Sequence, residues 1–376
     1  MASGPLKGLK FIEFAGIGPA PFCGMLLADL GADVVRIDRK GSQTGGDLVM
    51  GRGKRSIAID LKHAQGVEAT LDLIGKADAL FEGFRPGVME RLGLGPEVAL
   101  KRNPKLVYGR MTGWGQTGPW SSMAGHDIDY IALTGALHAM GKRGAPPSPP
   151  LNLVGDYGGG ALYLAFGLLA GVLEAKVSGK GQVIDCAMLD GAASLMTMFY
   201  SMRGAGLWTD AREDNLLDGA AHFYDSYVCA DGKLLAIGAI EPQFHAELVK
   251  GLGLSEADFP KRLDRASWPA YSEKIAAVVK TRTRDDWMKI FDGTDACVAP
   301  VLSMEEAPKH PHNVARETFQ TVQGIVQPGP APRFSRTAGA INGPPAKAGE
   351  HSANVLKDWG VDPERAASFL SGGAVG

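Results

Sequence analysis

The chain has 376 residues, of which 45% are apolar and 21% are charged, a composition typical of a globular protein. Its 39 basic and 41 acidic residues leave a net charge of −2, which excludes a global field favouring nucleic acid or an anionic membrane. We therefore expect neither as a partner, and any anionic ligand must be held by a local cluster of cations. The length allows two or three domains.

The cysteines and the apolar stretches bear on the compartment. Four scattered cysteines, with no Cys-x-x-Cys pair and no zinc-ligand spacing, predict reduced thiols in a cytoplasmic protein without a metal site. Residues 1–7 contain no apolar run of the signal-peptide type. The longest uncharged apolar stretch, 157–173, is glycine-rich and slightly short for a membrane span, so we expect a buried core helix there.

The N-terminal part of the chain predicts alternating strands and helices. Residues 9–14 and 33–38 read as strands on either side of a helix at 19–30, which is a βαβ unit with parallel strands. Further strand patterns lie near 56–60, 79–81 and 105–111, with helical patterns around 64–76 and 95–102 between them. This alternation favours an α/β fold, an open parallel sheet with helices on both faces.

The pattern changes in the second half of the chain. Helices are expected near 127–141, 157–176 and 188–204, with a strand at 182–186. Alternation across Asp231-Gly232 then predicts a hairpin of residues 223–229 and 233–239. The remaining expected elements are helices at 242–252, 269–280 and 284–291 and a strand at 297–301.

These elements predict two domains. We expect residues 1–190 and 318–376 to form a large α/β domain, and residues 225–310 to form a smaller inserted α+β domain. Residues 191–224 are expected to be linker helices and 311–317 a second linker. The tail from about 320 is rich in Pro, Gly and Ala, and we expect it to pack back on the large domain in partly extended form.

The first strand–helix turn, residues 16–21, is similar to a dinucleotide-binding loop, and Asp38 stands where a ribose-binding acid would. Pro21 replaces the third glycine of that pattern, and neither Pro19 nor Pro21 can donate an N–H group to a pyrophosphate. A structural turn is therefore favoured, and an NAD(P)-dependent dehydrogenase is a minor alternative.

Basic residues are dense between positions 36 and 62, and two arginines follow. A solvated surface explains such a run, but guanidinium groups at the carboxyl ends of parallel strands also hold phosphates in bidentate fashion. The residues concerned are Arg36, Arg39, Lys40, Arg52, Lys54, Arg55, Lys62, Arg85 and Arg91.

Three ionisable residues, His126, Asp156 and Glu241, stand in glycine-rich and otherwise apolar segments. Such placement carries a desolvation cost, and one His with two carboxylates suffices for acid–base chemistry at carbon. We expect His126 to project onto the positive end of the helix that follows it, and the helix that Asp156 opens to keep its carboxylate ionised. Each also has a structural explanation, since Asp156 suits an N-cap and Glu241 the first turn of a helix at Pro242.

Taken together, the motifs around these residues resemble those of the α-methylacyl-CoA racemases, within the family III CoA-transferase superfamily. The resemblance extends from about Leu6 to Arg333, and residues 40–55 are its least similar part. Its four motifs are Gly-His-Asp-Ile-x-Tyr, Asn-Leu-Val-Gly-Asp-x-Gly-Gly-Gly, Gly-Ala-Ile-Glu-Pro-Gln-Phe and Glu-Gly-Phe-Arg-Pro-Gly-Val-x-Glu-Arg-Leu-Gly.

The resemblance implies a family III CoA-transferase fold. Its members are interlocked homodimers with a nucleotide-binding-like sheet in the large domain and an active site completed by the partner's small domain. The implied ligand is an acyl-CoA thioester, with no metal and no cofactor beyond its CoA. The implied catalytic residues are His126, Asp156 and Glu241, supported by Asp127 and Tyr130. The implied CoA contacts are Arg39, Ile59, Asp60, Leu61, Lys62, Gly83, Phe84, Arg85, Arg91 and the residues from Gly125 to Tyr130.

The implied reaction is a 1,1-proton transfer that interconverts (2R)- and (2S)-2-methylacyl-CoA through an enolate, a step of lipid metabolism. His126 and Asp156 would act on opposite faces, Glu241 would orient the imidazole, and backbone N–H groups after His126, that of Asp127 included, would bind the enolate oxygen. The acyl chain, the base for each enantiomer and the chain that supplies each Glu241 stay open. The alternatives are a CoA transferase with Asp156 as covalent nucleophile and an acyl-CoA-binding protein without catalysis.

Overall fold

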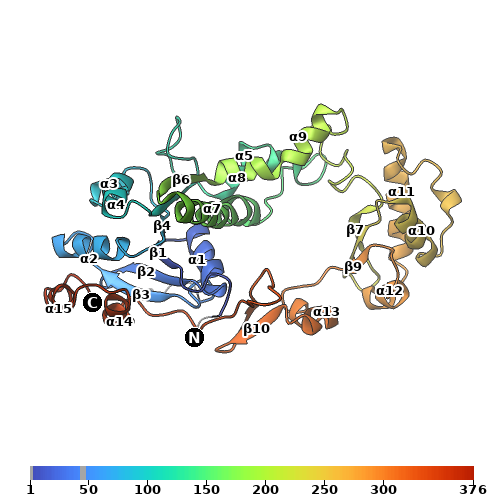
Figure 1. Cartoon of the computed structure of the whole chain (residues 1–376). Coiled ribbons are helices and arrows are strands. Elements are labelled where there is room, and N and C mark those ends of the chain that lie inside the picture. Colours follow the sequence, from blue (N-terminus) through green and yellow to red (C-terminus); the bar gives the residue numbers. More distant parts are fainter. Residues whose placement is uncertain (1–2, 43–47) are drawn as a thin grey trace. The chain divides into compact units, whose positions relative to one another are not determined.

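The computed structural model describes residues 3–42 and 48–376, which divide into two compact units (Figure 1). The first unit is made of Met1–Thr134, Leu151–Leu195 and Glu317–Gly376, and the second of Gly135–Pro150 and Met196–Arg316. The segment Gly135–Pro150, which we assigned to the large domain, clusters with the second unit. The guanidinium of Arg212 holds it there through hydrogen bonds to the backbone carbonyls of His138, Lys142 and Ala145.

A six-stranded parallel sheet lies at the centre of the first unit, which confirms the open α/β fold. The strand order β3-β2-β1-β4-β5-β6 reverses between β1 and β4, and in open α/β sheets ligands bind at the carboxyl ends of the strands beside such a reversal. The strands are β1 (Lys10–Phe14), β2 (Asp33–Arg39), β3 (Arg55–Ile59), β4 (Ala79–Glu82), β5 (Val107–Thr112) and β6 (Gln182–Ala187).

Apolar side chains of the strands bury both faces of this sheet. Ile12, Val35 and Leu80 belong to the core on one face, and Phe11 and Phe81 to the core on the other. The first core includes residues of α2 (Ala64–Ile74), α3 (Val88–Arg91), α4 (Pro96–Arg102), α14 (Ser352–Asp358) and α15 (Pro363–Ser371), and the second includes residues of α1 (Pro19–Asp29) and α7 (Leu162–Ser178).

The tail returns to the first unit, as expected. It begins with the hairpin of β10 (Phe319–Val322) and β11 (Ile325–Pro328) and then runs in extended form to the two last helices. Figure 1 shows α14 and α15 beside β3 and α2, although they are the last elements of the chain. Trp359 and Phe369 are buried in the core there, so the tail completes one face of the sheet.

Three of the expected helices differ from those in the structure, two in their continuity and one in where it begins. The helix expected at 127–141 is two short ones, α5 (Asp127–Ala132) and α6 (Ala136–Ala139), because Gly135 between them takes a left-handed φ of 80°. The helix expected at 188–204 is interrupted at Met196, where the chain passes from the first unit to the second. The helix expected at 157–176 begins earlier, as a π-helical segment. These elements are α8 (Met188–Leu195), α9 (Thr197–Gly204) and the π-helix Leu153–Ala161.

One helix of the described chain, Leu153–Ser178, is long and apolar enough to cross a membrane. Leu164, Leu168 and Val172 on it are buried in the core of the first unit, which is typical of a core helix. Phe166 and Val177, by contrast, are 73% and 90% exposed. The helix therefore buries one apolar side and leaves another without a partner within this unit.

The second unit is an α+β structure, but it is larger than the predicted small domain of residues 225–310. It also includes residues 196–224, which we expected to be linker helices, and residues 311–316, which we expected to lie in a second linker. Its hairpin of β7 (Tyr224–Val228) and β8 (Leu234–Gly238) is extended by β9 (Val298–Pro300) into an antiparallel sheet. Phe223, Leu248 and Trp287 belong to its separate core. Its further helices are α10 (Pro242–Gly251), α11 (Trp268–Val279), α12 (Arg284–Phe291) and α13 (Pro311–Ala315).

Candidate active site

A cavity of about 560 Å³ opens in the first unit at the carboxyl ends of four strands. The residues that follow β1, β4, β5 and β6 all contribute to its lining, so it lies where the strand order reverses. The side chains of His126, Asp156, Tyr130 and Arg85 are among those that line it. The sheet thus brings these four residues together, although Arg85 and Asp156 are 71 positions apart.

His126 is exposed and stands at the N-cap of α5. Its backbone N–H donates to the carboxylate of Asp129 at 2.9 Å, which holds the start of the helix. The imidazole lines the cavity beside the first turn of this helix. Because α5 has only six residues, its dipole is that of a short helix rather than of the long one we expected.

Asp156 lies in the first turn of the π-helical segment Leu153–Ala161 and is half-buried. Asn152, rather than Asp156, is the N-cap of this segment, and its amide donates to Asp156 Oδ2 at 3.1 Å. Burial raises the pKa of the Asp156 carboxyl, as does the charge of Asp127, while His126 lowers it. We expected a helix terminus to favour the ionised form, but desolvation is the larger effect.

Asp127 connects the two candidate bases. Its buried carboxylate accepts the backbone N–H groups of Gly155 and Asp156 at 2.6 and 2.7 Å. A Cβ on Gly155 would lie 2.6 Å from that carboxylate, so only glycine allows the approach. Tyr130 packs edge-on against Trp114 and donates its hydroxyl to the carbonyl of Gly125, and burial raises the pKa of Tyr130 to about 12. Both residues are thus held in place next to the candidate bases.

Glu241 lies in the second unit and is not among the residues that line this cavity. It is exposed and forms the N-cap of α10, and its carbonyl accepts the N–H of His245 at 2.9 Å. Among the described residues, its carboxylate forms no ion pair with a basic side chain.

Much of the predicted basic cluster is structural, which corrects the expectation that it holds phosphates. Arg36 pairs with Asp38 at 2.8 Å, and Arg52 with Asp29 and Lys54 with Glu13 at 2.5 Å, all six side chains being at most 7% exposed. Arg55 pairs with Asp33 and Asp358, and Lys40 donates to the carbonyl of Gly373. Asp38 also accepts from Ser56 Oγ, so its carboxylate is not free to bind a ribose. This removes the acidic residue on which the dinucleotide-binding alternative depended.

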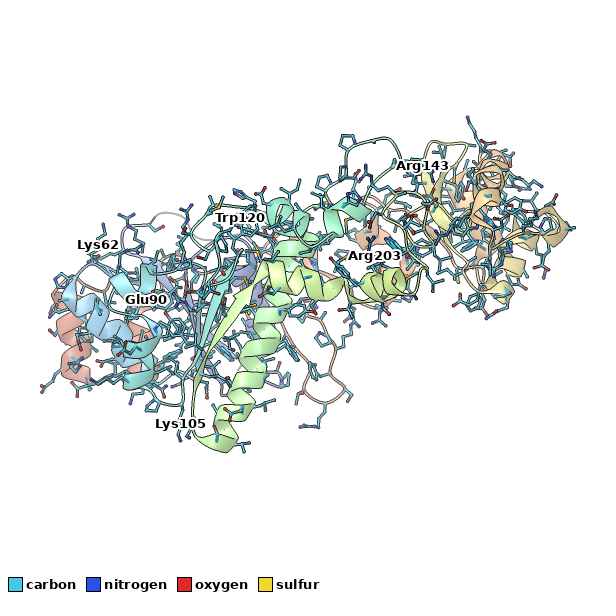
Figure 2. The ribbon with its side chains drawn as sticks, turned by 90° about the horizontal axis from the view of Figure 1, so that it is seen from above. Lys62, Glu90, Lys105, Trp120, Arg143 and Arg203 are labelled. Carbon is cyan, nitrogen blue, oxygen red and sulfur yellow. The ribbon has the colours of Figure 1, made fainter. Side chains whose placement is uncertain are left out.

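Other basic residues remain available. Among the described residues, Arg39, Lys62, Arg85 and Arg91 are exposed and have no carboxylate within ion-pair distance (Lys62 is labelled in Figure 2). They follow or end β2, β3 and β4, or lie on α3, at the edge of the sheet where the cavity opens. Of the stretch 40–55 that we found least similar to the family, residues 43–47 lie outside the described residues.

The other predicted CoA contacts lie at the end of β3 or in the loops that follow β3 and β4, at the same edge of the sheet. Ile59 ends β3 and is buried, and the carboxylate of Asp60 accepts the N–H of Lys62 at 3.0 Å. Leu61 and Phe84 pack against the core, and Gly83 and Phe84 line the cavity. Sequence reasoning alone did not single out Asn152, although it stands in the same motif, four residues before Asp156.

Comparisons with known proteins bear on the family and the fold of the chain. The model of CoA-transferase family III matches residues 6–352. The alpha-methylacyl-CoA racemases of Mus musculus and Homo sapiens are 48% and 44% identical over 364 residues, which cover 96% of this chain and 94% of each relative. A crystal structure of a CAIB/BAIF family protein from Brucella suis has the same fold, with a TM-score of 0.81 at 24% identity over 95% of this chain and 100% of that one.

Proposed function

The chain belongs to CoA-transferase family III, and from this premise we propose that it is an α-methylacyl-CoA racemase. One observation supports this best: an imidazole, His126, and a half-buried carboxylate, Asp156, line one cavity and are connected through Asp127. Inversion at the α-carbon of a thioester needs two acid–base groups on opposite faces of a planar intermediate.

In the proposed reaction, one base removes the α-proton and the conjugate acid of the other delivers a proton to the opposite face. The C–H electron pair moves into the thioester as an enolate, and its return to carbon forms the new C–H bond. The backbone N–H of Asp127 has no acceptor among the described residues, and donors of this kind contribute about 3–4 kcal/mol to enolate stabilisation. Only side chains, backbone N–H groups and the thioester take part.

The exposed cations supply the charge that a CoA moiety requires. We assign its phosphates to Arg39, Lys62, Arg85 and Arg91, which lie at the same edge of the sheet as the cavity and have no carboxylate partner among the described residues. Of these four, Arg85 lines the cavity itself. The buried ion pairs of Arg36, Arg52 and Lys54 are excluded from this role because their guanidinium and ammonium groups already have carboxylates.

We further propose a homodimer in which Glu241 of one protomer orients His126 of the other. Two observations support it: the exposed carboxylate of Glu241 at an N-cap, and the unpartnered apolar side of α7 with Phe166, Leu173 and Val177. A second copy of this chain would cover that side.

The racemase is tested by incubating the purified protein with one enantiomer of a 2-methylacyl-CoA in D₂O and following the α-position by NMR and chiral analysis. We expect exchange of one α-hydrogen with scrambling of configuration and no second substrate. Transfer of CoA to an added carboxylate, with a hydroxylamine-sensitive acyl group on Asp156, would instead identify a transferase.

The dimer is tested by mixing His126→Ala and Glu241→Ala protomers, each inactive alone, under conditions of subunit exchange. A mixed dimer then contains one intact site if the pair crosses the two chains, so racemisation should return. A monomeric mass in solution would reject the dimer, and verified mixed dimers without activity would place the pair within one chain.

A further inference from the structure

We propose that Glu82, Arg110 and Glu90 form a bridge that positions the CoA-binding side chains Arg85 and Arg91. We call it the Glu82–Arg110–Glu90 bridge. The inference rests on the proposed function, because it assigns how the CoA-binding loop of that site keeps its shape. None of the three residues lines the cavity, so they are positioning residues rather than binding ones.

The bridge begins at the end of β4. Glu82 is its last residue and is completely buried. Glu82 Oε2 accepts the backbone N–H of Phe84 at 2.7 Å, and Oε1 accepts Arg110 Nε at 3.2 Å. The carboxylate therefore holds the first turn of the loop that carries Arg85, which lines the cavity.

Arg110 carries the connection across to α3. It lies on β5 and is 7% exposed, and its two terminal nitrogens donate to the two carboxylate oxygens of Glu90 at 2.8 and 3.2 Å. Glu90, labelled in Figure 2, lies on α3 directly before Arg91. The guanidinium of Arg110 thus joins Glu82 to Glu90. Glu82 accepts the N–H of Phe84, which directly precedes Arg85, and Glu90 directly precedes Arg91. Bidentate arginine–carboxylate pairs fix orientation as well as distance.

Charge makes this bridge sensitive to pH. Burial raises the pKa of Glu82 to about 7, and the titratable or charged groups that face it are Arg110 and Tyr108 on β5 and Glu90 on α3. When pH falls through about 7, Glu82 becomes neutral and loses most of its attraction for Arg110. We therefore expect the affinity for CoA to decrease as the pH falls through this range.

The effect of Glu82 on folding stability has the opposite sign. Because its pKa is higher in the folded than in the unfolded chain, the folded chain binds the proton more tightly, and the contribution of Glu82 to stability decreases as pH rises to about 7. A residue that served stability alone would not strengthen CoA binding over the range in which it weakens the fold. The two readouts separate a positioning role from a structural one.

The experiment measures CoA binding by calorimetry, with KM and kcat for the acyl-CoA, in Glu82→Gln. The glutamine amide cannot accept from both Phe84 and Arg110, so we expect about ten-fold weaker binding at pH 8, a matching rise in KM and kcat within about two-fold. The matched control is Glu97→Gln, an exposed glutamate on α4, which should bind as the unsubstituted protein does. Between pH 8 and 6.5 the CoA affinities of the unsubstituted protein and of Glu82→Gln should converge, because Glu82 becomes neutral over this range. The titration of the CoA phosphate affects both proteins alike and cancels in the comparison.

Coupling to the arginines is tested in the same assay. Arg91→Ala and Arg85→Ala together should weaken CoA binding, and adding Glu82→Gln to that pair should weaken it little further, because the bridge acts through them. If Glu82→Gln does not fold, the pH titration of the unsubstituted protein, repeated with dephospho-CoA, measures the same loss of affinity near pH 7.

The outcomes separate this inference from the proposed function. If the unsubstituted protein binds CoA and Glu82→Gln binds it equally at every pH, the bridge has no positioning role. Full additivity of Glu82→Gln with the arginine substitutions would also overturn it. If the unsubstituted protein does not bind CoA at all, the proposed function fails, and the bridge fails with it.

Discussion

Replacing His126 by alanine is expected to abolish racemisation while leaving slow exchange of the α-proton in one enantiomer only. Asp156 remains in the cavity as a base for the face that it serves, but no acid is left to protonate the other face. One well-placed base contributes about 10²- to 10⁴-fold, so the residual exchange should be slow and measurable. Asp156→Ala should show the mirror-image result. Proton exchange in D₂O, followed separately for each enantiomer, measures both.

The pH dependence adds an independent check on Asp156. Burial raises the pKa of the Asp156 carboxyl. As the pH is lowered, exchange that uses this carboxylate as base should therefore be lost at a higher pH than it would be with an ordinary aspartate. His312→Ala, an exposed histidine on α13, is the control and should leave both exchange rates unchanged. Equal loss of exchange for both enantiomers in both active-site variants would contradict the assignment to opposite faces.

Replacing Arg52 by methionine is expected to lower the free energy of unfolding of the first unit by about 3–5 kcal/mol. Arg52 and Asp29 form an ion pair with side chains only 2% and 1% exposed, so removal of one partner leaves a buried charge without compensation. Arg52 also donates to the side chain of Gln327 and the carbonyl of Pro328, which ties the tail to helix α1. Urea unfolding followed by circular dichroism measures the loss.

Arg39→Met is the matched control, since Arg39 is exposed and has no ion pair among the described residues. It should change KM for acyl-CoA and leave the unfolding midpoint in place, the reverse of Arg52→Met. The double variant Asp29→Asn with Arg52→Met should recover part of the stability, because the uncompensated carboxylate is then gone. A loss below about 1 kcal/mol in Arg52→Met would show that the pair is not needed for the fold.

The alternation of apolar segments was enough to predict the parallel sheet of the first unit, because strand and helix periodicities are local properties of the chain. The hairpin across Asp231-Gly232 was predicted for the same reason. Helix continuity was not, since the left-handed conformation of Gly135 and the passage between units at Met196 depend on the packing of their neighbours. The π-helical start of the segment with Asp156 likewise depends on the carboxylate of Asp127, which is distant in sequence.

The candidate site divides in the same way. The sequence by itself determined which residues are the candidates for catalysis: His126, Asp156 and Glu241 stand out because ionisable groups among glycines and apolar residues are rare without a role. Only the tertiary structure decided which cations are available, because a carboxylate partner such as Asp29 or Glu13 lies far from its arginine or lysine along the chain. It also decided the direction in which the pKa of Asp156 departs from its ordinary value, since burial, a property of the whole fold, is the largest effect and raises it.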